Sequence, residues 1–272
     1  MKVVFLDIDG TLTVAGENVP PKSAVEAIKA TQAKGNLVYL CTGRNMGMLA
    51  PLLQYGFDGV VGLGGAYVMC GKEVIFNHPM DKAVLDDMLD VLKRNNVFRT
   101  IEAQDMTYGD EDLGSFLASQ TSANSEIERW RKALAKSLGI RPMKEYDGRP
   151  IYKVVIMADS NDRLAEARAK FEKDFNFAIQ DVTAHSCVNG DIMDRSFDKG
   201  QAIQRVCEHL GVDVADNYGF GDSMNDLEMI QTVGVSVCID TGSEKLKALS
   251  DVIAPRVEED GLYRAFKDLG LI

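Results

Sequence analysis

Two aspartates follow the first apolar run of the chain, whose residues 3–12 read VVFLDIDGTL. Asp7 and Asp9 alternate with Ile8, so at the periodicity of a strand both carboxylates point to the same side. In open α/β sheets, ligands bind outside the carboxyl ends of the strands, where loops carry the polar groups that buried strands lack. We therefore expect these carboxylates to take part in chemistry at the end of a buried strand.

Two simpler explanations of the acidic pair stay open at this point. A calcium loop of the EF-hand type needs a third oxygen ligand at its fifth position and glycine at its sixth, whereas Gly10 stands at the fourth. An ordinary acidic turn after a strand would look the same until other motifs are considered.

Further polar residues follow other apolar runs, and together they suit phosphate chemistry. Thr42 follows the run 37–41, Lys199 opens a predicted helix, and Asp222 lies in the sequence GDSMND at 221–226. A carboxylate that attacks a phosphate meets like-charge repulsion of about 4 kcal/mol per charge pair at ~4 Å and an effective dielectric constant of ~20. Cations are therefore required, and we expect Mg²⁺ to be held by Asp7, Asp9 and Asp222.

The remaining polar groups would receive the phosphate itself. Lys199 offers a point charge close to helix-terminal N–H groups, which also favour anions. Thr42 supplies a hydroxyl group, and Gly43 allows the backbone to come close. Lys199 alone is also compatible with a solvated lysine at a helix start. Arg44 suits either a salt bridge or a substrate contact.

The elements that must position these residues form an α/β pattern. Pro20-Pro21 and Gly35 bracket a helical stripe between the first predicted strand, which runs into Asp7, and the predicted strand 37–41. A strand–helix–strand order of this length implies a parallel sheet. The same pattern returns late in the chain, where helix 199–210 ends at Gly211. The other predicted strands of this sheet are 60–66, 218–220, 235–239 and 252–253. Ser223 and Asp226 have the spacing of a capping box for the helix that follows them.

Residues 81–185 are predicted to form a separate α/β unit. Its predicted helices are 85–92, 127–138 and 164–171, and its predicted strands are 152–157 and 177–182. We expect a core domain in two parts, 1–80 and 186–272, with residues 81–185 as an inserted domain. His78, His185 and His209 lack metal-ligand spacing and are expected at the surface or in packing, and Trp130 in the core of the insertion.

Composition excludes several classes of partner. With 272 residues and 46% hydrophobic residues, the chain can bury two moderate cores. The net charge of −11 offers no basic field for nucleic acid. The five cysteines are scattered without metal-finger spacing, and their odd number argues against a disulfide framework. No apolar stretch approaches the ~20 residues that span a bilayer, and no signal sequence is recognised, so we expect a cytoplasmic protein without a membrane partner.

Four of these motifs together resemble a known family. DIDGT at 7–11, Thr42 after an apolar strand, Lys199 in DKG, and GDSMND at 221–226 are similar, in order and spacing, to motifs I to IV of the haloacid dehalogenase (HAD) superfamily. The insertion between the second and third motifs resembles that of the Cof-type phosphatases, which carry a large α/β cap of type C2. The resemblance implies a Rossmann-like, doubly wound parallel sheet with an inserted α/β cap domain.

The resemblance also implies a role for each matching residue. Asp7 would be the nucleophile that forms an aspartyl-phosphate, and Asp9 the general acid and base. Thr42 and Lys199 would bind the phosphoryl group. The implied substrate-binding residues are Gly43, Arg44 and Asn225. The implied metal-site residues are Asp7, Asp9 (through its backbone carbonyl), Asp222 and Asp226.

The implied function is a Mg²⁺-dependent phosphatase for small phosphate esters, above all sugar phosphates, with the cap closing over the active site. Two alternatives remain: a phosphotransferase or phosphomutase of the phosphomannomutase type, and a non-catalytic protein that binds phosphorylated metabolites. One departure is visible, because Gly64-Gly65-Ala66 stands where related proteins often carry Asn-Gly-Ala. Specificity is expected from cap residues such as Arg149, Tyr152 and Lys153, while the substrate and the oligomeric state are not indicated.

Overall fold

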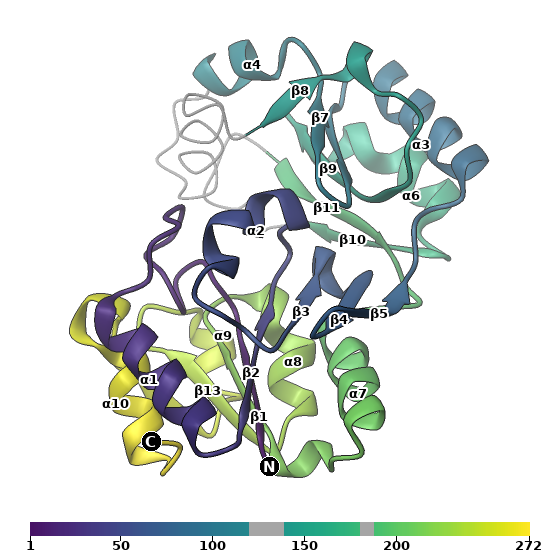
Figure 1. The fold of residues 1–272 in the computed structure, drawn as a ribbon. Coiled ribbons are helices and arrows are strands. Elements are labelled where there is room, and N and C mark those ends of the chain that lie inside the picture. The colour runs from purple at the N-terminus through teal and green to yellow at the C-terminus, as the bar shows by residue number, and fades with distance from the viewer. Residues whose placement is uncertain (120–138, 180–187) are drawn as a thin grey trace. The chain divides into compact units, whose positions relative to one another are not determined.

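The computed structural model describes residues 1–119, 139–179 and 188–272, which form two compact units (Figure 1). The first unit consists of Met1–Arg44, Leu49–Asn77 and Phe197–Ile272. The second consists of Asn45–Met48 and His78–Ser196. The predicted helix 127–138, residues 180–182 of a predicted strand, Trp130, His185 and Cys187 lie outside the described residues.

The first unit is built on an eight-stranded sheet with the order β14-β13-β12-β1-β2-β3-β4-β5. All neighbours from β14 to β3 are parallel, and β4 and β5 add an antiparallel hairpin at one edge. The expected parallel α/β core is thus present, with a hairpin in addition. The strands are β1 (Val3–Leu6), β2 (Leu37–Cys41), β3 (Gly59–Gly62), β4 (Tyr67–Cys70), β5 (Glu73–Asn77), β12 (Tyr218–Gly221), β13 (Val235–Ile239) and β14 (Val252–Ala254).

Helices cover both faces of this sheet, as a doubly wound fold requires (Figure 1). On one face, Phe5 and Tyr39 pack with Ile203 and Met229 of two adjacent helices, and on the other the rings of Phe220 and Phe266 lie 5.2 Å apart. The helices are α1 (Lys22–Ala33), α2 (Met46–Leu53), α7 (Lys199–Leu210), α8 (Leu227–Thr232), α9 (Glu244–Lys247) and α10 (Gly261–Asp268).

Helix α7 begins and ends where its sequence indicates. The side chain of Asp198 accepts a hydrogen bond of 2.7 Å from the backbone N–H of Gln201, which caps the start of the helix. Gly211 ends it in the left-handed conformation at φ 67°. The cap fixes Lys199 as the first residue of the helix.

The second unit has a six-stranded sheet with the order β10-β11-β9-β6-β7-β8. Its neighbours are antiparallel except for β7 and β8. One face packs against helices through a core that includes Leu85, Met88, Ile156 and Phe171. The elements are α3 (Lys82–Arg94), β6 (Phe98–Ala103), β7 (Thr107–Gly109), α4 (Leu113–Ser119), β8 (Ile140–Pro142), β9 (Ile151–Ala158), α6 (Ala165–Phe171), β10 (Phe175–Ile179) and β11 (Val188–Asp194).

The structure differs from the predicted boundary at the end of the insertion. Residues 186–272 were predicted to belong to the core, but β11 pairs with both β9 and β10 in the second unit. Strand β11 makes its backbone hydrogen bonds with two antiparallel partners. Its own sequence, which includes three polar residues, does not indicate these partners.

None of the described helices is long and apolar enough to cross a membrane.

Candidate active site

Asp7 and Asp222 lie at the same edge of the core sheet. Strands β1 and β12 are parallel neighbours, with Leu6 opposite Phe220. The N–H of Asp7 donates a hydrogen bond of 2.9 Å to the carbonyl of Phe220, which continues the pairing past the end of β1. Two aspartates far apart in the sequence therefore meet because each directly follows its own parallel strand.

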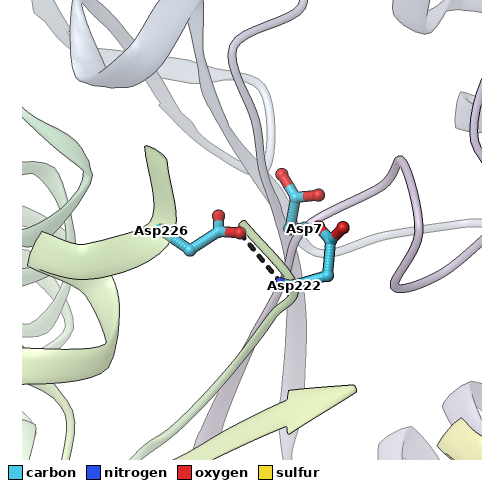
Figure 2. A group of neighbouring side chains, drawn as sticks. All are labelled: Asp7, Asp222 and Asp226. Atoms are coloured by element: carbon cyan, nitrogen blue, oxygen red, sulfur yellow. Dashed lines mark hydrogen bonds between the residues drawn. The ribbon is translucent and has the colours of Figure 1, made fainter. Parts of the chain in front are cut away.

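Asp226 joins this pair, and Lys199 lies against it. Each of the three aspartates, Asp7, Asp222 and Asp226, has a carboxylate oxygen within 4.8 Å of an oxygen of the other two (Figure 2). The Nζ of Lys199 is 2.8 Å from Oδ1 of Asp7 and 2.5 Å from Oδ1 of Asp226. Only 3% of the lysine is exposed, so its charge depends on these two carboxylates.

Asp226 uses both of its oxygens inside the protein. Its Oδ1 accepts from Lys199, and its Oδ2 accepts from the backbone N–H groups of Asp222 (3.0 Å) and Ser223 (3.1 Å). The bond to Asp222 is the dashed line in Figure 2. Asp226 thus holds the loop after β12 and the lysine in fixed positions, and the expected capping spacing of Ser223 and Asp226 is used.

Burial dominates the electrostatics of the cluster. Desolvation, and then the charge of Asp226, raise the pKa of Asp7 above its usual range, although Lys199 opposes this. Desolvation and the charge of Asp7 raise the pKa of Asp222 in the same way. Burial alone would lower the pKa of Lys199, but Asp226 and Asp7 prevail and raise it well above the ordinary value. The cluster therefore has more negative charge than its lysine can balance.

A divalent cation fits the residues that are present. The Oδ1 of Asp222 is buried and has no hydrogen-bond partner among the described residues. A Cβ atom at Gly10 would lie 2.5 Å from Oδ2 of Asp222, so only glycine leaves room for this carboxylate beside the DIDGT turn. Carboxylate oxygens are the ligands that Mg²⁺ prefers. Asp7 and Asp222 could hold such an ion, while the oxygens of Asp226 are already engaged.

The carboxylate of Asp9 lies outside this group of described acidic side chains and is held by Arg44. The guanidinium of Arg44 donates from Nε to Oδ2 (2.9 Å) and from Nη2 to Oδ1 (2.7 Å) of Asp9. The N–H of Gly16 donates to Oδ1 as well, at 2.8 Å. Of the two roles considered for Arg44, the structure contains the salt bridge.

The remaining predicted residues are placed as follows. Thr42 follows β2, is 2% exposed, and accepts at Oγ1 a hydrogen bond of 3.2 Å from the N–H of Arg44. Gly43 lies between these two residues at the same strand end. Asn225 is exposed, and its Oδ1 accepts from the hydroxyl of Ser223 at 2.8 Å.

The second unit carries a cluster of charged side chains on the sheet face opposite helices α3 and α6, where Lys153 and Glu102 are buried and Asp191 is partly exposed. Lys153 lies directly opposite Glu102 in the pairing of β9 with β6. Its Nζ is 3.4 Å from Glu102 and 3.5 Å from Asp191 of β11, and the side chains of Lys153 and Glu102 are 7% and 4% exposed. We call Glu102, Lys153 and Asp191 the cap charge cluster. Arg149, by contrast, is paired with Asp147 in a loop.

Two parts of the site were not predicted from the sequence. The close approach of Gly10 to Asp222 was indicated in the sequence only weakly, by the presence of a glycine in DIDGT. The side chain of Asn18, whose Oδ1 accepts from Nη1 of Arg44 at 2.6 Å, had none, because nothing in the sequence connects residue 18 to residue 44.

The chain matches a known protein family along nearly its whole length. The family model described as haloacid dehalogenase-like hydrolase matches residues 4–266. The chain is 26% identical to the putative phosphatase YkrA of Bacillus subtilis, over 100% of this chain and 98% of that protein. It is 27% identical to the 5-amino-6-(5-phospho-D-ribitylamino)uracil phosphatase YwtE of the same organism, over 96% of each.

Solved structures share the fold along the whole chain. The HAD subclass IIB sugar phosphatase BT4131 superimposes with a TM-score of 0.79 at 22% identity, and 100% of each chain is covered. A protein from Geobacillus kaustophilus HTA426 gives a TM-score of 0.80 at 24% identity, covering 100% of this chain and 99% of the other. The chain belongs to the haloacid dehalogenase-like hydrolases and, within them, to the Cof-type phosphatases that carry an inserted cap.

Proposed function

We propose that this chain is a Mg²⁺-dependent phosphatase that hydrolyses sugar phosphates through an aspartyl-phosphate formed on Asp7. The observation that carries the proposal is the buried ammonium group of Lys199, 2.8 Å from Asp7 and 2.5 Å from Asp226, beside the carboxylate of Asp222. A structural core has no need of two buried carboxylates on one lysine with a third, half-buried carboxylate beside them, whereas phosphoryl transfer needs an acidic nucleophile with cations close to it.

In the first half of the reaction, an oxygen of Asp7 attacks phosphorus and the bond from phosphorus to the ester oxygen breaks. Asp9 donates a proton to that oxygen, so the sugar leaves as an alcohol. Lys199 keeps Asp7 in place and offsets its repulsion from the phosphate, and the hydroxyl of Thr42 donates a hydrogen bond to a phosphoryl oxygen. Mg²⁺, held by Asp7 and Asp222 with the backbone carbonyl of Asp9, would supply the remaining positive charge.

In the second half, water replaces the sugar. Asp9 takes a proton from the water, whose oxygen attacks the phosphorus of the aspartyl-phosphate, and the bond to Asp7 breaks. Inorganic phosphate leaves and Asp7 is restored as a carboxylate. Asp9 returns to the protonated form that the next first step needs.

The preference for sugar phosphates rests on the relatives. BT4131 is described as a sugar phosphatase, and YwtE acts on a phosphoribityl compound.

The test is phosphate release from a panel of sugar phosphates, with and without Mg²⁺. We expect turnover only with the metal, and we expect Asp7→Asn to abolish it. Asp240→Asn, which removes one carboxylate charge from an exposed site in the same unit, is the matched control and should retain activity. Turnover that survives Asp7→Asn would refute the proposal. Conversion of one sugar phosphate isomer to another without free phosphate would instead indicate a phosphomutase.

A further inference from the structure

The backbone on either side of Lys199 is pressed against another part of the first unit. Asp198 precedes the lysine, Gly200 follows it, and helix α7 begins at the lysine itself. On the Asp198 side lies the turn Leu63–Gly65, which follows β3 and which we call the β3 turn. On the Gly200 side lies helix α8, which follows the acidic loop after β12. Each of these two contacts depends on a glycine.

Gly65 makes the contact on the first side. A Cβ atom at Gly65 would lie 2.4 Å from the carbonyl oxygen of Asp198, about 1 Å closer than ordinary van der Waals contact, which begins at 3.4 Å. The backbone of Gly65 has φ +107°, a conformation that residues with a side chain rarely adopt. The carbonyl of Asp198 also accepts a hydrogen bond of 3.0 Å from the N–H of Ala202 in the first turn of helix α7. A residue larger than glycine at 65 would therefore displace either the start of this helix or the β3 turn.

The β3 turn is held from its other side by the loop that carries Thr42. The N–H of Gly64 donates to the carbonyl of Thr42 at 3.0 Å, and the N–H of Leu63 donates to the carbonyl of Arg44 at 3.0 Å. Leu63 is buried and has φ 53°, a conformation that costs free energy in a residue with a side chain and persists only where the surroundings impose it. The turn therefore resists displacement, and the start of helix α7 is the part that would move.

Gly200 makes the contact on the second side. A Cβ atom there would lie 2.6 Å from the carbonyl oxygen of Glu228 and 2.4 Å from Oγ1 of Thr232, both in helix α8. The hydroxyl of Thr232 donates to that same carbonyl at 2.6 Å, so the two atoms hold each other in place. Helix α8 directly follows Asp226, whose carboxylate contacts the ammonium group of Lys199. The contact at Gly200 therefore fixes the start of helix α7 relative to Asp226.

We propose that Gly65 and Gly200 are positioning residues for Lys199. A backbone that is fixed on both sides fixes the origin of the lysine side chain, so that Nζ reaches Asp7 at 2.8 Å and Asp226 at 2.5 Å together. Hydrogen bonds between charged groups are short and weaken steeply with displacement, so a shift of about 1 Å at the helix start breaks or lengthens at least one of them. The role of Lys199 beside the nucleophile rests on the proposed function.

Gly65→Ala and Gly200→Ala each crowd one of the two contacts, and Gly211→Ala is their matched control. Gly211 ends the same helix with φ +67°, and nothing else in the described part of the chain lies within 4 Å of its would-be Cβ. Alanine at 211 thus strains helix α7 at the end away from Lys199. Gly200 lies inside the helix, where alanine is the most favourable residue, so Gly200→Ala tests the inference even if Gly65→Ala prevents folding.

The first measurement observes the ammonium group itself and needs no turnover. In protein labelled with ¹⁵N in its lysines, a buried ammonium group bonded to carboxylates is protected from exchange with water and gives an NMR signal. The spectrum of Lys199→Arg, which lacks the signal of Lys199, identifies it. We expect this signal to move by more than its line width in Gly65→Ala and in Gly200→Ala, and to stay in place in Gly211→Ala.

The second measurement separates kcat from KM. A displaced lysine fails in the transition state, when Asp7 approaches the phosphate, so both variants should lower kcat on the order of 100-fold. KM should change less than about threefold, because Thr42 and the rest of the site still receive the phosphate. Gly211→Ala should change neither constant.

The two measurements separate this inference from the proposed function. The inference is overturned if the ammonium signal of Lys199 is the same in the wild type and the three glycine variants, or if Gly211→Ala lowers kcat as much as the other two. If the signal moves as expected while the wild type hydrolyses no ester, the positioning of Lys199 stands and the proposed function fails.

Discussion

Lys199 and Asp226 form the innermost ion pair of the site, with Nζ 2.5 Å from Oδ1 and exposed fractions of 3% and 0% for the two side chains. The same carboxylate accepts two backbone N–H groups through its other oxygen. Its oxygens are therefore occupied before any metal ion arrives. This separates Asp226, which positions its neighbours, from Asp222, whose Oδ1 is buried without a hydrogen-bond partner among the described residues.

Asp222→Asn and Asp226→Asn should consequently lower the activity in different ways. Replacing Asp222 removes a ligand charge, so the Mg²⁺ concentration that gives half-maximal activity should rise by about tenfold or more. Replacing Asp226 turns an amide toward Lys199 and should lower kcat on the order of 100-fold through misplacement, with little change in the Mg²⁺ requirement. Titration of turnover with Mg²⁺ measures both quantities. An equal rise in the Mg²⁺ requirement for both variants would show that Asp226 is a ligand.

The stability of the metal-free protein should fall as the pH rises. Asp7 and Asp222 have raised pKa values in the folded state, so between the ordinary carboxyl value of about 4 and the folded values the unfolded chain binds fewer protons than the folded one. The slope of the unfolding free energy with pH is then negative. The stabilisation is complete below about pH 4 and is lost as the pH rises through the folded pKa values.

Saturating Mg²⁺ should reverse this loss, because it neutralises the carboxylates that the folded state must otherwise keep protonated. Thermal unfolding at about pH 5 and about pH 8, with and without the metal, measures the effect. We expect a larger rise of Tm on adding Mg²⁺ at the higher pH. The same rise at both pH values would mean that the cation binds elsewhere.

Much of the core could be predicted because its signals are local. Strand β1 runs into Asp7, and helix α7 has its cap at Asp198 and its end at Gly211, all within a few residues of one another in the sequence. The parallel order then follows from short connections and handedness. Those rules bring Asp7 and Asp222 to one sheet edge without any knowledge of side-chain packing.

The parts that were missed depend on distant pairings. The salt bridge of Arg44 with Asp9 joins residues 35 positions apart and was one of two possibilities. Strand β11 is recognisable only from its partners β9 and β10, since its polar residues resemble those of a loop.

Gly10→Ala should weaken Mg²⁺ binding, whereas Gly35→Ala should not. Gly10 has φ +87°, and a Cβ there would lie 2.5 Å from Oδ2 of Asp222. Gly35 has nearly the same conformation, φ +80°, but nothing lies within 4 Å of its would-be Cβ. Each alanine should cost about 1–2 kcal/mol of unfolding free energy from backbone strain. Only Gly10→Ala should also weaken the Mg²⁺-dependent rise of Tm, and equal Mg²⁺ responses would exclude the contact with Asp222 as a constraint.

Lys153→Met tests whether the cap charge cluster serves specificity. The substitution leaves Glu102, which is 3% exposed, without its neighbouring ammonium group, so the unfolding free energy should fall by about 3 kcal/mol. Adding Glu102→Met should restore most of this loss, because the buried charge is then gone. Lys170→Met, at an exposed pair with Asp87, should change stability by less than about 0.5 kcal/mol.

The stabilised double variant, Lys153→Met with Glu102→Met, then isolates the functional contribution. It should hydrolyse p-nitrophenyl phosphate with nearly wild-type kcat/KM, because that substrate carries no sugar. On sugar phosphates, a specificity role for Lys153, as expected from the sequence, predicts a fall in kcat/KM on the order of 100-fold. Chemical denaturation gives the stability and steady-state kinetics the specificity. If the double variant retains its preference for sugar phosphates, the cluster has a structural role and specificity comes from other residues.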